Sequence, residues 1–370
     1  MNFKIKRTRL LKALENVNRA VSSKNPLPVL TGIKFETRKD GLVLTGSNSD
    51  ITIQTKITED LDIIETGGIV LSARYILEII KKIESDYIHV FILDGNLTRI
   101  EGADSKFDLN GTDVTDYPNI ELRKQGQLLS INSIILKNSI EQTLFATSDK
   151  ETRPVLTGVN IEANGNVLKF IATNSFRLAR KVIEIDNDLS FNIIVPKKSL
   201  LEVERIIDKD EMIEIYISDR RLLIIIDDIY IQTRLIDGRF PDTNRIIPTE
   251  FNSTLTSKSS YLLNAIDRAS LITSEQKTII NLKMSSDQVI LTSYSKEIGS
   301  LKENLNDCFY EGKPLNLSFN ARYMAEAIRY INSEKIIIEF TSELKPMIVK
   351  AMDKNDVIQL ILPVRTQSNM

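Results

Sequence analysis

LSARYILEIIKK at residues 71–82 has two counterparts later in the chain, VPKKSLLEVERI at 195–206 and FNARYMAEAIRY at 319–330. All three share the spacing K/R-x-x-x-E-x-x-K/R, and the first cation of each stretch is 124 positions from that of the next. Ahead of that cation stands a Ser, Pro or Asn, residue types that favour the beginning of a helix. Each stretch therefore predicts a strand end that runs directly into a helix.

A second motif repeats with nearly the same period. PVLTG occurs at 28–32 and again at 154–158, each time after a stretch with apolar residues at helical spacing. A period this long indicates repeated domains, not a solenoid of short units. Since 370 residues exceed what one hydrophobic core usually supports, we predict three domains. Their predicted ranges are 1–125, 126–250 and 251–370, with boundaries near 123–127 and 248–251.

The local pattern within each repeat indicates antiparallel sheets with about two helices. Alternating apolar and polar residues at 45–53, 213–217 and 335–340 predict strands. Hairpins without βαβ crossovers place the fold in the α+β class, with a helix pair covering one face of a sheet layer. The turn pairs predicted to link hairpins are Asp40 with Gly41, Asp94 with Gly95, and Asn164 with Gly165.

Composition argues against several classes of protein. No run of 18 or more apolar residues is present, and the start MNFKIKRTRLLKAL lacks the apolar core of a signal peptide, so we expect a cytoplasmic protein. The single Cys308 can form no internal disulfide and no cysteine-based zinc site. We therefore expect neither a metal nor another cofactor.

Catalytic motifs are absent from the sequence. The one histidine, His89, lies in an alternating stretch that predicts a strand, and no motif supplies the positioned partner that a general base requires, so we expect a structural role. The phosphate-binding loop, the dinucleotide-binding glycine motif and the H-E-x-x-H motif do not occur. A metal-dependent DNA-modifying enzyme that uses some of the 50 Asp and Glu residues is the weaker, alternative interpretation.

Charge is distributed unevenly along the predicted helices. The formal net charge is −2, yet Arg9, Lys12 and Arg19 fall on one face of the first helix, opposite its apolar residues. For a single helix, a solvated face with i,i+4 charge pairs explains such a pattern. Its recurrence at domain spacing predicts a localised positive surface that holds a polyanion. The glutamates between the cations should dilute the potential, so phosphate contacts should be few, weak and sensitive to salt.

Several longer segments carry a family resemblance. NPLPVL at 25–30, ETRPVLTGV at 151–159, ATNSFRL at 172–178, DGRFPDT at 237–243 and LPVR at 362–365 closely resemble the β sliding clamps of bacterial DNA polymerase III, in order along essentially the whole chain. The variant spelling is similar to clamps of low-GC Gram-positive bacteria. The resemblance implies a DNA clamp fold that closes as a head-to-tail homodimeric ring around duplex DNA, a processivity factor without catalytic activity.

The resemblance also implies partners and DNA contacts. The implied partners are double-stranded DNA bound without sequence preference, a second copy of the chain, the replicative polymerase alpha subunit, the clamp loader and other proteins with a clamp-binding motif. The implied DNA-binding cations are Lys12, Lys24, Arg74, Lys150, Arg153, Lys197, Lys198 and Arg205.

A cleft for short extended peptides between the second and third domains is implied as well. Its implied residues are Leu156, Thr173, Ser175, Phe176, Arg177, Leu178, Pro241, Arg245, Ile246, Tyr323, Pro346, Leu362, Pro363, Val364 and Arg365. Phe176 stands where the family often has His, and Asn174 where it often has Asp, so we expect a more apolar wall and a shifted peptide preference. The polar tail 366–370 extends beyond the usual end of the family, and we expect it to be disordered.

The last implied site is the contact between subunits, at sheet edges of the first and third domains. Its implied residues are Lys106, Phe107, Leu109, Leu271, Ile272, Glu297 and Glu303. A clamp paralogue or a phage-borne clamp that serves other partners is an alternative that the sequence leaves open.

Overall fold

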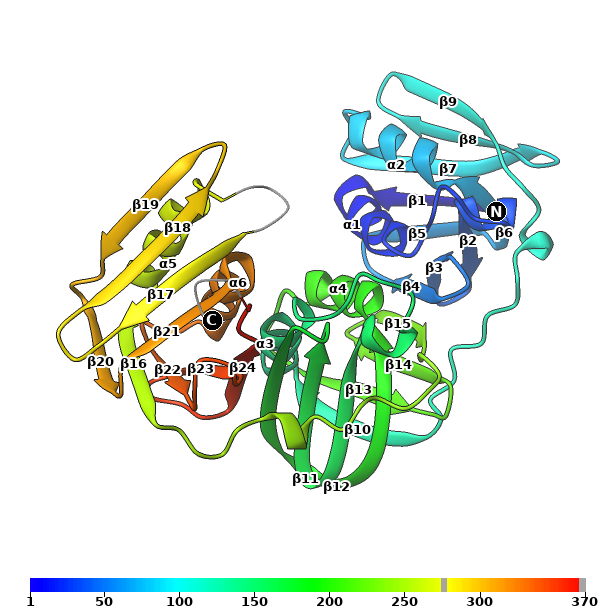
Figure 1. The fold of residues 1–370 in the computed structure, drawn as a ribbon. Coiled ribbons are helices and arrows are strands. Elements are labelled where there is room, and N and C mark those ends of the chain that lie inside the picture. The colour runs from blue at the N-terminus through cyan, green and yellow to red at the C-terminus, as the bar shows by residue number, and fades with distance from the viewer. Residues whose placement is uncertain (274–277, 366–370) are drawn as a thin grey trace. The chain divides into compact units, whose positions relative to one another are not determined.

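The computed structural model describes residues 1–273 and 278–365 (Figure 1). The predicted disorder of the tail 366–370 therefore concerns residues outside the described part of the chain. The chain forms two compact units, one made of residues 1–134 and 202–235 and the other of residues 135–201 together with those from 236 onward. None of the helices among the described residues has the length and apolar character needed to cross a membrane.

The same succession of elements occurs three times, namely a strand, a helix, further strands, a second helix and three closing strands. The first copy consists of β1 Asn2–Lys6, α1 Arg7–Asn18, η1 Pro28–Thr31, β2 Gly32–Arg38, β3 Gly41–Ser47, β4 Ile51–Ile57, β5 Leu61–Glu65, β6 Gly67–Ser72, α2 Ala73–Lys82, β7 Tyr87–Asp94, β8 Leu97–Gly102, β9 Ser105–Asn110 and η2 Val114–Asp116. The second consists of β10 Gln127–Asn132, α3 Ser133–Leu144, η3 Pro154–Leu156, β11 Gly158–Thr173, β12 Arg177–Pro196, α4 Lys197–Ile206, β13 Met212–Ile217, β14 Arg221–Ile226, β15 Ile229–Arg234 and η4 Asn244–Ile246.

The third copy consists of β16 Ser253–Lys258, α5 Ser259–Ser270, β17 Ile279–Met284, β18 Val289–Ser295, β19 Gly299–Asn304, β20 Cys308–Gly312, β21 Leu315–Asn320, α6 Ala321–Ile331, β22 Lys335–Phe340, β23 Met347–Ala351 and β24 Val357–Ile361. In every copy the second helix begins at the residue after a strand end, as the repeated stretch predicts. At α6 the side-chain oxygen of Asn320 accepts a hydrogen bond of 3.1 Å from the backbone N–H of Tyr323, which caps the helix.

The strand pairs formed by the described residues are all antiparallel, which confirms the predicted α+β class. The first unit holds a five-stranded sheet in the order β5-β1-β7-β8-β9 and an eight-stranded sheet in the order β10-β13-β14-β15-β4-β3-β2-β6. The second unit holds a seven-stranded sheet in the order β11-β12-β24-β23-β22-β16-β20 and a four-stranded sheet in the order β19-β18-β17-β21. Strands from neighbouring copies thus share one sheet at the β15–β4 and β12–β24 pairs.

Two local predictions are wrong. The stretch 45–53 does not form one strand, because a turn that begins at Asn48 separates β3 from β4. In this turn the side-chain oxygen of Asn48 accepts hydrogen bonds from the backbone N–H groups of Asp50 and Ile51. Asn164 and Gly165 do not form a hairpin turn. They lie inside β11 and pair with Ser190 and Leu189 of β12, and the register of this long ribbon shifts just after them, between Gly165 and Val167. The chain reverses after Thr173 instead.

The helices α1, α2, α5 and α6 each bury one apolar face against strands of their own unit. In the first unit α1 contacts α2, β3 and β4, and buries Leu10, Leu14 and Val17 (Figure 1). In the second unit α5 and α6 contact each other over a core that includes Ile266 and Ile328. Full burial of one such side chain stabilises the fold by roughly 1.5–3 kcal/mol. The uncovered faces of the helices carry the cations.

His89 has the surroundings of a structural residue. Its ring nitrogen Nε2 lies 2.7 Å from Oδ1 of Asn2 on the paired strand β1, and its ring lies 4.6 Å from that of Phe91. No three His, Cys, Asp or Glu side chains in the described part of the chain are grouped so that they could hold a metal ion.

Candidate functional sites

A tight turn between β11 and β12 forms one wall of a pocket in the second unit. The hydroxyl of Thr173 donates to the carbonyl of Arg177 at 2.6 Å, and the side-chain oxygen of Asn174 accepts the backbone N–H groups of Phe176 and Arg177, each at 3.1 Å. Ser175 has a φ of +74°, in the left-handed region. These side-chain caps hold the turn in one shape, so the residues that it presents to the pocket are fixed in place.

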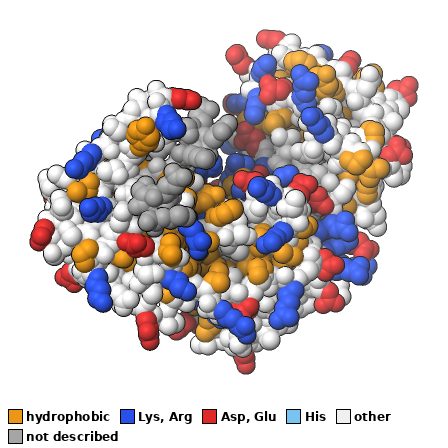
Figure 2. Space-filling model, viewed as in Figure 1, with side chains coloured by type: hydrophobic (Ala, Val, Ile, Leu, Met, Phe, Trp, Pro, Cys, Tyr) orange, Lys and Arg blue, Asp and Glu red, His pale blue; other side chains and the backbone are white. Residues whose placement is uncertain are grey.

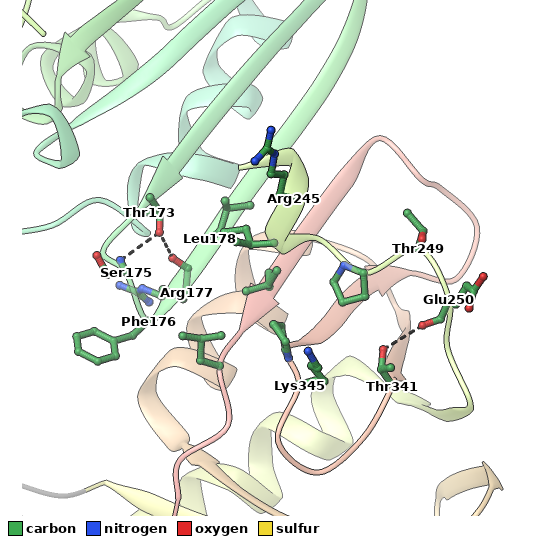
Figure 3. A pocket seen from close by; sticks show the side chains of 15 residues that line it. Thr173, Ser175, Phe176, Arg177, Leu178, Arg245, Thr249, Glu250, Thr341 and Lys345 are labelled. Carbon is green, nitrogen blue, oxygen red and sulfur yellow. Dashed lines mark hydrogen bonds between the residues drawn. The ribbon is translucent and has the colours of Figure 1, made fainter. Parts of the chain in front are cut away.

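The pocket has a volume of about 570 Å³, which is within the range of small-molecule and peptide-anchor sites (Figure 3). Many of the residues implied by the resemblance line it, namely Thr173, Ser175, Phe176, Arg177, Leu178, Arg245, Ile246, Pro346 and Leu362. Sequence reasoning missed the other lining residues, which are Pro248, Thr249, Glu250, Thr341, Lys345 and Leu360.

Six implied cleft residues do not line this pocket. Leu156 is buried in the cluster beneath it, together with Leu178 and Leu360. Tyr323 lies one layer behind, with its ring centroid 4.5 Å from the guanidinium carbon of Arg177. The remaining four are Pro241, Pro363, Val364 and Arg365. Among them, Val364 bonds through its backbone N–H to the carbonyl of Ser318 at 2.7 Å.

The pocket combines an apolar base with a mixed rim. Leu178 and Leu360 are almost fully buried at the base, whereas Phe176 is 58% exposed at one end. Figure 3 shows the Phe176 ring at that end, and Thr249, Glu250 and Thr341 at the other. Arg245 and Lys345 add two cations, and Glu250 one carboxylate. Such a lining suits a short peptide that inserts apolar side chains and places polar groups at the rim.

Arg177 is held from several sides. Its guanidinium donates to the carboxylate of Glu326 in α6 and to the carbonyl of Phe145. The rings of Phe145 and Tyr323 lie 5.0 and 4.5 Å from its central carbon. Because the residue is only 7% exposed, Arg177 acts as a fixed part of the pocket wall and not as a mobile surface cation.

The implied DNA-binding cations fall into two groups. In the first unit Lys12 bonds Asp208 at 3.0 Å and Arg205 bonds Glu202 at 2.9 Å, and in the second unit Lys197 bonds Asp149 at 2.8 Å. The hydrogen bond and charge of Lys197 hold the pKa of the Asp149 carboxyl below its ordinary value. The others are exposed and make no ion pair with a described residue, namely Lys24, Arg74, Lys150, Arg153 and Lys198.

The glutamates of the repeated stretch differ from the expectation that they simply dilute the surface potential. Glu78 is exposed and lies 3.7 Å from Lys82 on its own helix. Glu202 and Glu326 have side chains only 17% and 18% exposed, and each accepts from an arginine of its own helix and from one outside that helix. These two carboxylates therefore fix neighbouring arginines in place.

Hydrophobic side chains also gather on the surface. On the face seen in Figure 2 they cluster, with lysine and arginine side chains among them, where Figure 1 draws α3 and β24. Strand β24, which belongs to the seven-stranded sheet, carries the pocket residue Leu360.

The implied subunit-contact residues lie at or beside two sheet edges. Among the described strands, β9 pairs only with β8 and carries Lys106, Phe107 and Leu109, while β19 pairs only with β18 and carries Glu303. Leu271, at the end of α5, is 75% exposed, and Phe107 is 38% exposed. The remaining implied residues are Ile272, after α5, and Glu297, in the turn before β19. Within the chain Lys106 lies 3.5 Å from Glu101, and Glu303 accepts from Arg268.

Three successive copies of one α+β unit, whose second helices carry the repeated cation register and whose neighbouring sheets are merged, are the architecture of a DNA clamp. Models of the DNA polymerase III beta subunit match the chain over its N-terminal domain at 1–121, its central domain at 130–242 and its C-terminal domain at 244–365.

Similar proteins match over the whole length. The chain is 36% identical to the beta sliding clamp of Bacillus subtilis and 37% identical to that of Staphylococcus epidermidis, covering 99% of this chain and 100% of each relative. The crystal structure of the Bacillus subtilis DNA polymerase sliding clamp superimposes with a TM-score of 0.95 at 36% identity, covering 99% of both chains. The beta subunit of Streptococcus pyogenes gives a TM-score of 0.95 at 33% identity, covering 99% of this chain and 100% of that one.

The chain belongs to the family of DNA polymerase III beta subunits, the β sliding clamps, and its function is that of a processivity clamp. Its relatives come from Bacillus and Staphylococcus, which are low-GC Gram-positive bacteria, as the variant spelling of the motifs predicts.

Proposed function

We propose that two copies of the chain associate head to tail into a ring that encircles duplex DNA and tethers the replicative polymerase to it. The full-length similarity to sliding clamps, over 99% of the chain, is the observation that carries this proposal. We further propose that the chain is not itself catalytic and works in the cytoplasm, where a clamp loader supplies the ATP-driven opening for which this sequence has no nucleotide-binding loop.

Ring closure joins the β9 edge of one copy to the β19 edge of its partner. Both strands leave one row of backbone N–H and C=O groups without a partner strand among the described residues, and pairing them across subunits satisfies those groups. Exposed Phe107 and Leu271 support an apolar centre for this contact. Lys106 and Glu303 support charge complementarity. On closure Lys106 leaves Glu101, Glu303 leaves Arg268, and the two pair with each other across the contact.

The cations hold DNA loosely inside this ring. Several of them share their charge with a carboxylate, as Lys12 does with Asp208 and Lys197 with Asp149. Fewer counterions are then released on binding, so the electrostatic affinity for duplex is low, and salt lowers it further. A closed ring does not depend on this affinity for retention, which leaves the clamp free to slide.

The pocket holds peptide segments of the proteins that the clamp tethers. The replicative polymerase alpha subunit, the clamp loader and other proteins with a clamp-binding motif insert leucine and aromatic side chains over Leu178 and Leu360. Phe176 makes the exposed end of the pocket apolar, which favours peptides with an aromatic residue there.

The test is retention on nicked circular plasmid after loading with clamp loader and ATP in moderate salt. The plasmid is then cut once. Loss of the protein on linearisation is the expected result, because a ring slides off a free end. Equal retention on circular and linear plasmid would contradict the ring and indicate ordinary electrostatic binding.

A further inference from the structure

Glu326 is shared between the peptide pocket and the cationic surface of α6. One carboxylate oxygen accepts from Arg177 of the pocket wall, and the other accepts from Nε of Arg322 at 3.0 Å. The carboxylate is 18% exposed, so its charge interacts more strongly with both arginines than it would in bulk water. A single negative charge thus stabilises two cations, of which Arg177 lines the pocket and Arg322 does not.

The two arginines differ in how firmly they are held. Arg177 lies between two aromatic rings and is 7% exposed. Its Nε is buried without a hydrogen-bond partner in the described part of the chain, so the ion pair with Glu326 offsets much of the cost of its burial. Arg322 has a side chain that is 72% exposed and can turn toward a new anion at little cost.

Arg322 is linked electrostatically to the cations implied in DNA binding. The pKa of Asp149 is lowered first by its hydrogen bond to Lys197, and the charges of Arg322 and Arg177 lower it further. Asp149 precedes Lys150 in the loop that also carries Arg153. A phosphate near this loop therefore lies within the electrostatic reach of Arg322.

We propose that Glu326 couples phosphate binding at Arg322 to peptide binding in the pocket. A phosphate that draws Arg322 away leaves the carboxylate to Arg177 alone, and Arg177 then holds the turn at Phe176 and the pocket wall more firmly. A preorganised wall costs the peptide less to bind. The clamp on DNA consequently binds its partners more tightly than the free clamp, and by reciprocity a bound peptide strengthens the hold on DNA by the same factor.

The inference rests on the proposed function, since it requires both a polyanion and a peptide ligand. The experiment measures the dissociation constant of a fluorescein-labelled decapeptide with leucine and phenylalanine anchors, with and without a 30-base-pair duplex in low salt. The full chain is compared with Arg322→Gln, Glu326→Gln and the control Arg329→Gln. Arg329 is exposed on the same helix, carries the same charge and makes no ion pair with a described residue.

The duplex should tighten peptide binding to the unaltered chain by about two- to tenfold, the factor typical of coupled neighbouring charges. Without duplex, R322Q should bind the peptide as tightly as the unaltered chain does in the presence of duplex. Adding duplex to R322Q should not change its peptide affinity. R329Q should keep the full response. E326Q should bind the peptide more weakly and show no response.

An R322Q variant that responds to duplex like R329Q would overturn the coupling, and so would an unaltered chain whose peptide affinity ignores the duplex although both ligands bind. These outcomes differ from a failure of the proposed function, in which the unaltered chain binds no peptide or no duplex at all. Arg322 is exposed, so R322Q tests the inference even where the removal of Glu326 impairs folding.

Discussion

Phe176 is a large apolar side chain that the fold leaves 58% exposed, at the end of the pocket. Its backbone carbonyl accepts from Leu362 at 3.0 Å, so the position is fixed by the main chain and not by burial of the ring. A residue of this kind contributes little to stability and much to the binding of an apolar ligand.

Phe176→Ala should therefore weaken the binding of a leucine- and phenylalanine-containing peptide by about 1–2 kcal/mol, roughly five- to thirtyfold, with an unchanged melting temperature. The measurement is fluorescence anisotropy with the labelled peptide. Phe309→Ala is the matched control, because Phe309 is 69% exposed and does not line the pocket. Equal losses in both variants would remove Phe176 from the binding site.

His89 offers a pH probe that the sequence makes unusually clean, since it is the single histidine. Burial lowers the pKa of its imidazole below the ordinary 6.5, and the charge of Lys4 adds to that effect while Glu101 opposes it. The unfolded chain therefore binds the proton more tightly than the folded chain. The contribution of the neutral His89 to the unfolding free energy is fully present above about pH 6.5, and it is lost as the pH falls below that value.

The single imidazole resonance should consequently titrate below 6.5 in the folded protein and near 6.5 in urea, as measured by proton NMR. His89→Gln should reduce the rise in melting temperature between about pH 5.5 and 7.5. A folded-state pKa at or above the urea value would show that Glu101 dominates, and would reverse the sign of the pH dependence.

Among the elements, the start of β10 depends on a close approach of two backbones. Gly126, just before β10, has a φ of +101°, and a Cβ there would lie 1.9 Å from the carbonyl oxygen of Ile217 on β13. Gly95, in the β7–β8 turn, also has a positive φ, of +55°, but a Cβ there would meet no atom within 4 Å.

Gly126→Ala should lower the unfolding free energy by about 1–3 kcal/mol more than Gly95→Ala, because both introduce backbone strain but only the first introduces a clash. Thermal unfolding followed by circular dichroism compares the two variants. Similar melting temperatures would mean that β10 shifts away from β13 without loss of stability.

Element order was largely predictable because it depends on local spacing, as the strand-to-helix junctions at Ser72, Pro196 and Asn320 show. The failures occurred where a distant partner decides the outcome. Asn164 and Gly165 have the ideal composition for a turn, yet they pair with Ser190 and Leu189 in a ribbon that continues through them. No local pattern within residues 158–173 indicates how long the partner strand β12 is, and therefore none indicates that β11 continues through Asn164 and Gly165.

At the scale of the whole molecule, the repeat period predicts three domains but not how their strands combine. The β4–β15 and β12–β24 pairs merge sheets from neighbouring copies, and such long-range pairing leaves no trace in a period of 124 residues. The same holds for the pocket. The family resemblance predicted turn residues such as Ser175 as part of the pocket. It did not predict Thr341 and Lys345, which lie in a loop distant in sequence, or Pro248, which lies in a stretch predicted only as a domain boundary.

Closure of the ring gives the last prediction. A head-to-tail contact uses two different surfaces of the chain, so one substitution in either surface weakens both contacts of the dimer. Leu271 is 75% exposed, which means that replacing it should leave the fold intact, whereas a carboxylate buried in an apolar contact costs several kcal/mol.

Leu271→Glu should therefore sediment as a monomer at micromolar concentration in analytical ultracentrifugation, where the unaltered chain sediments as a dimer, and it should not be retained on nicked circular plasmid. Leu344→Glu is the matched control, since Leu344 is 58% exposed and lies outside the implied contact residues. Its expected behaviour is that of the unaltered chain, because a carboxylate added at an exposed position stays solvated. A dimeric Leu271→Glu protein that still stays on circular DNA would place the subunit contact away from the end of α5, and the β9–β19 pairing would lose its main apolar support.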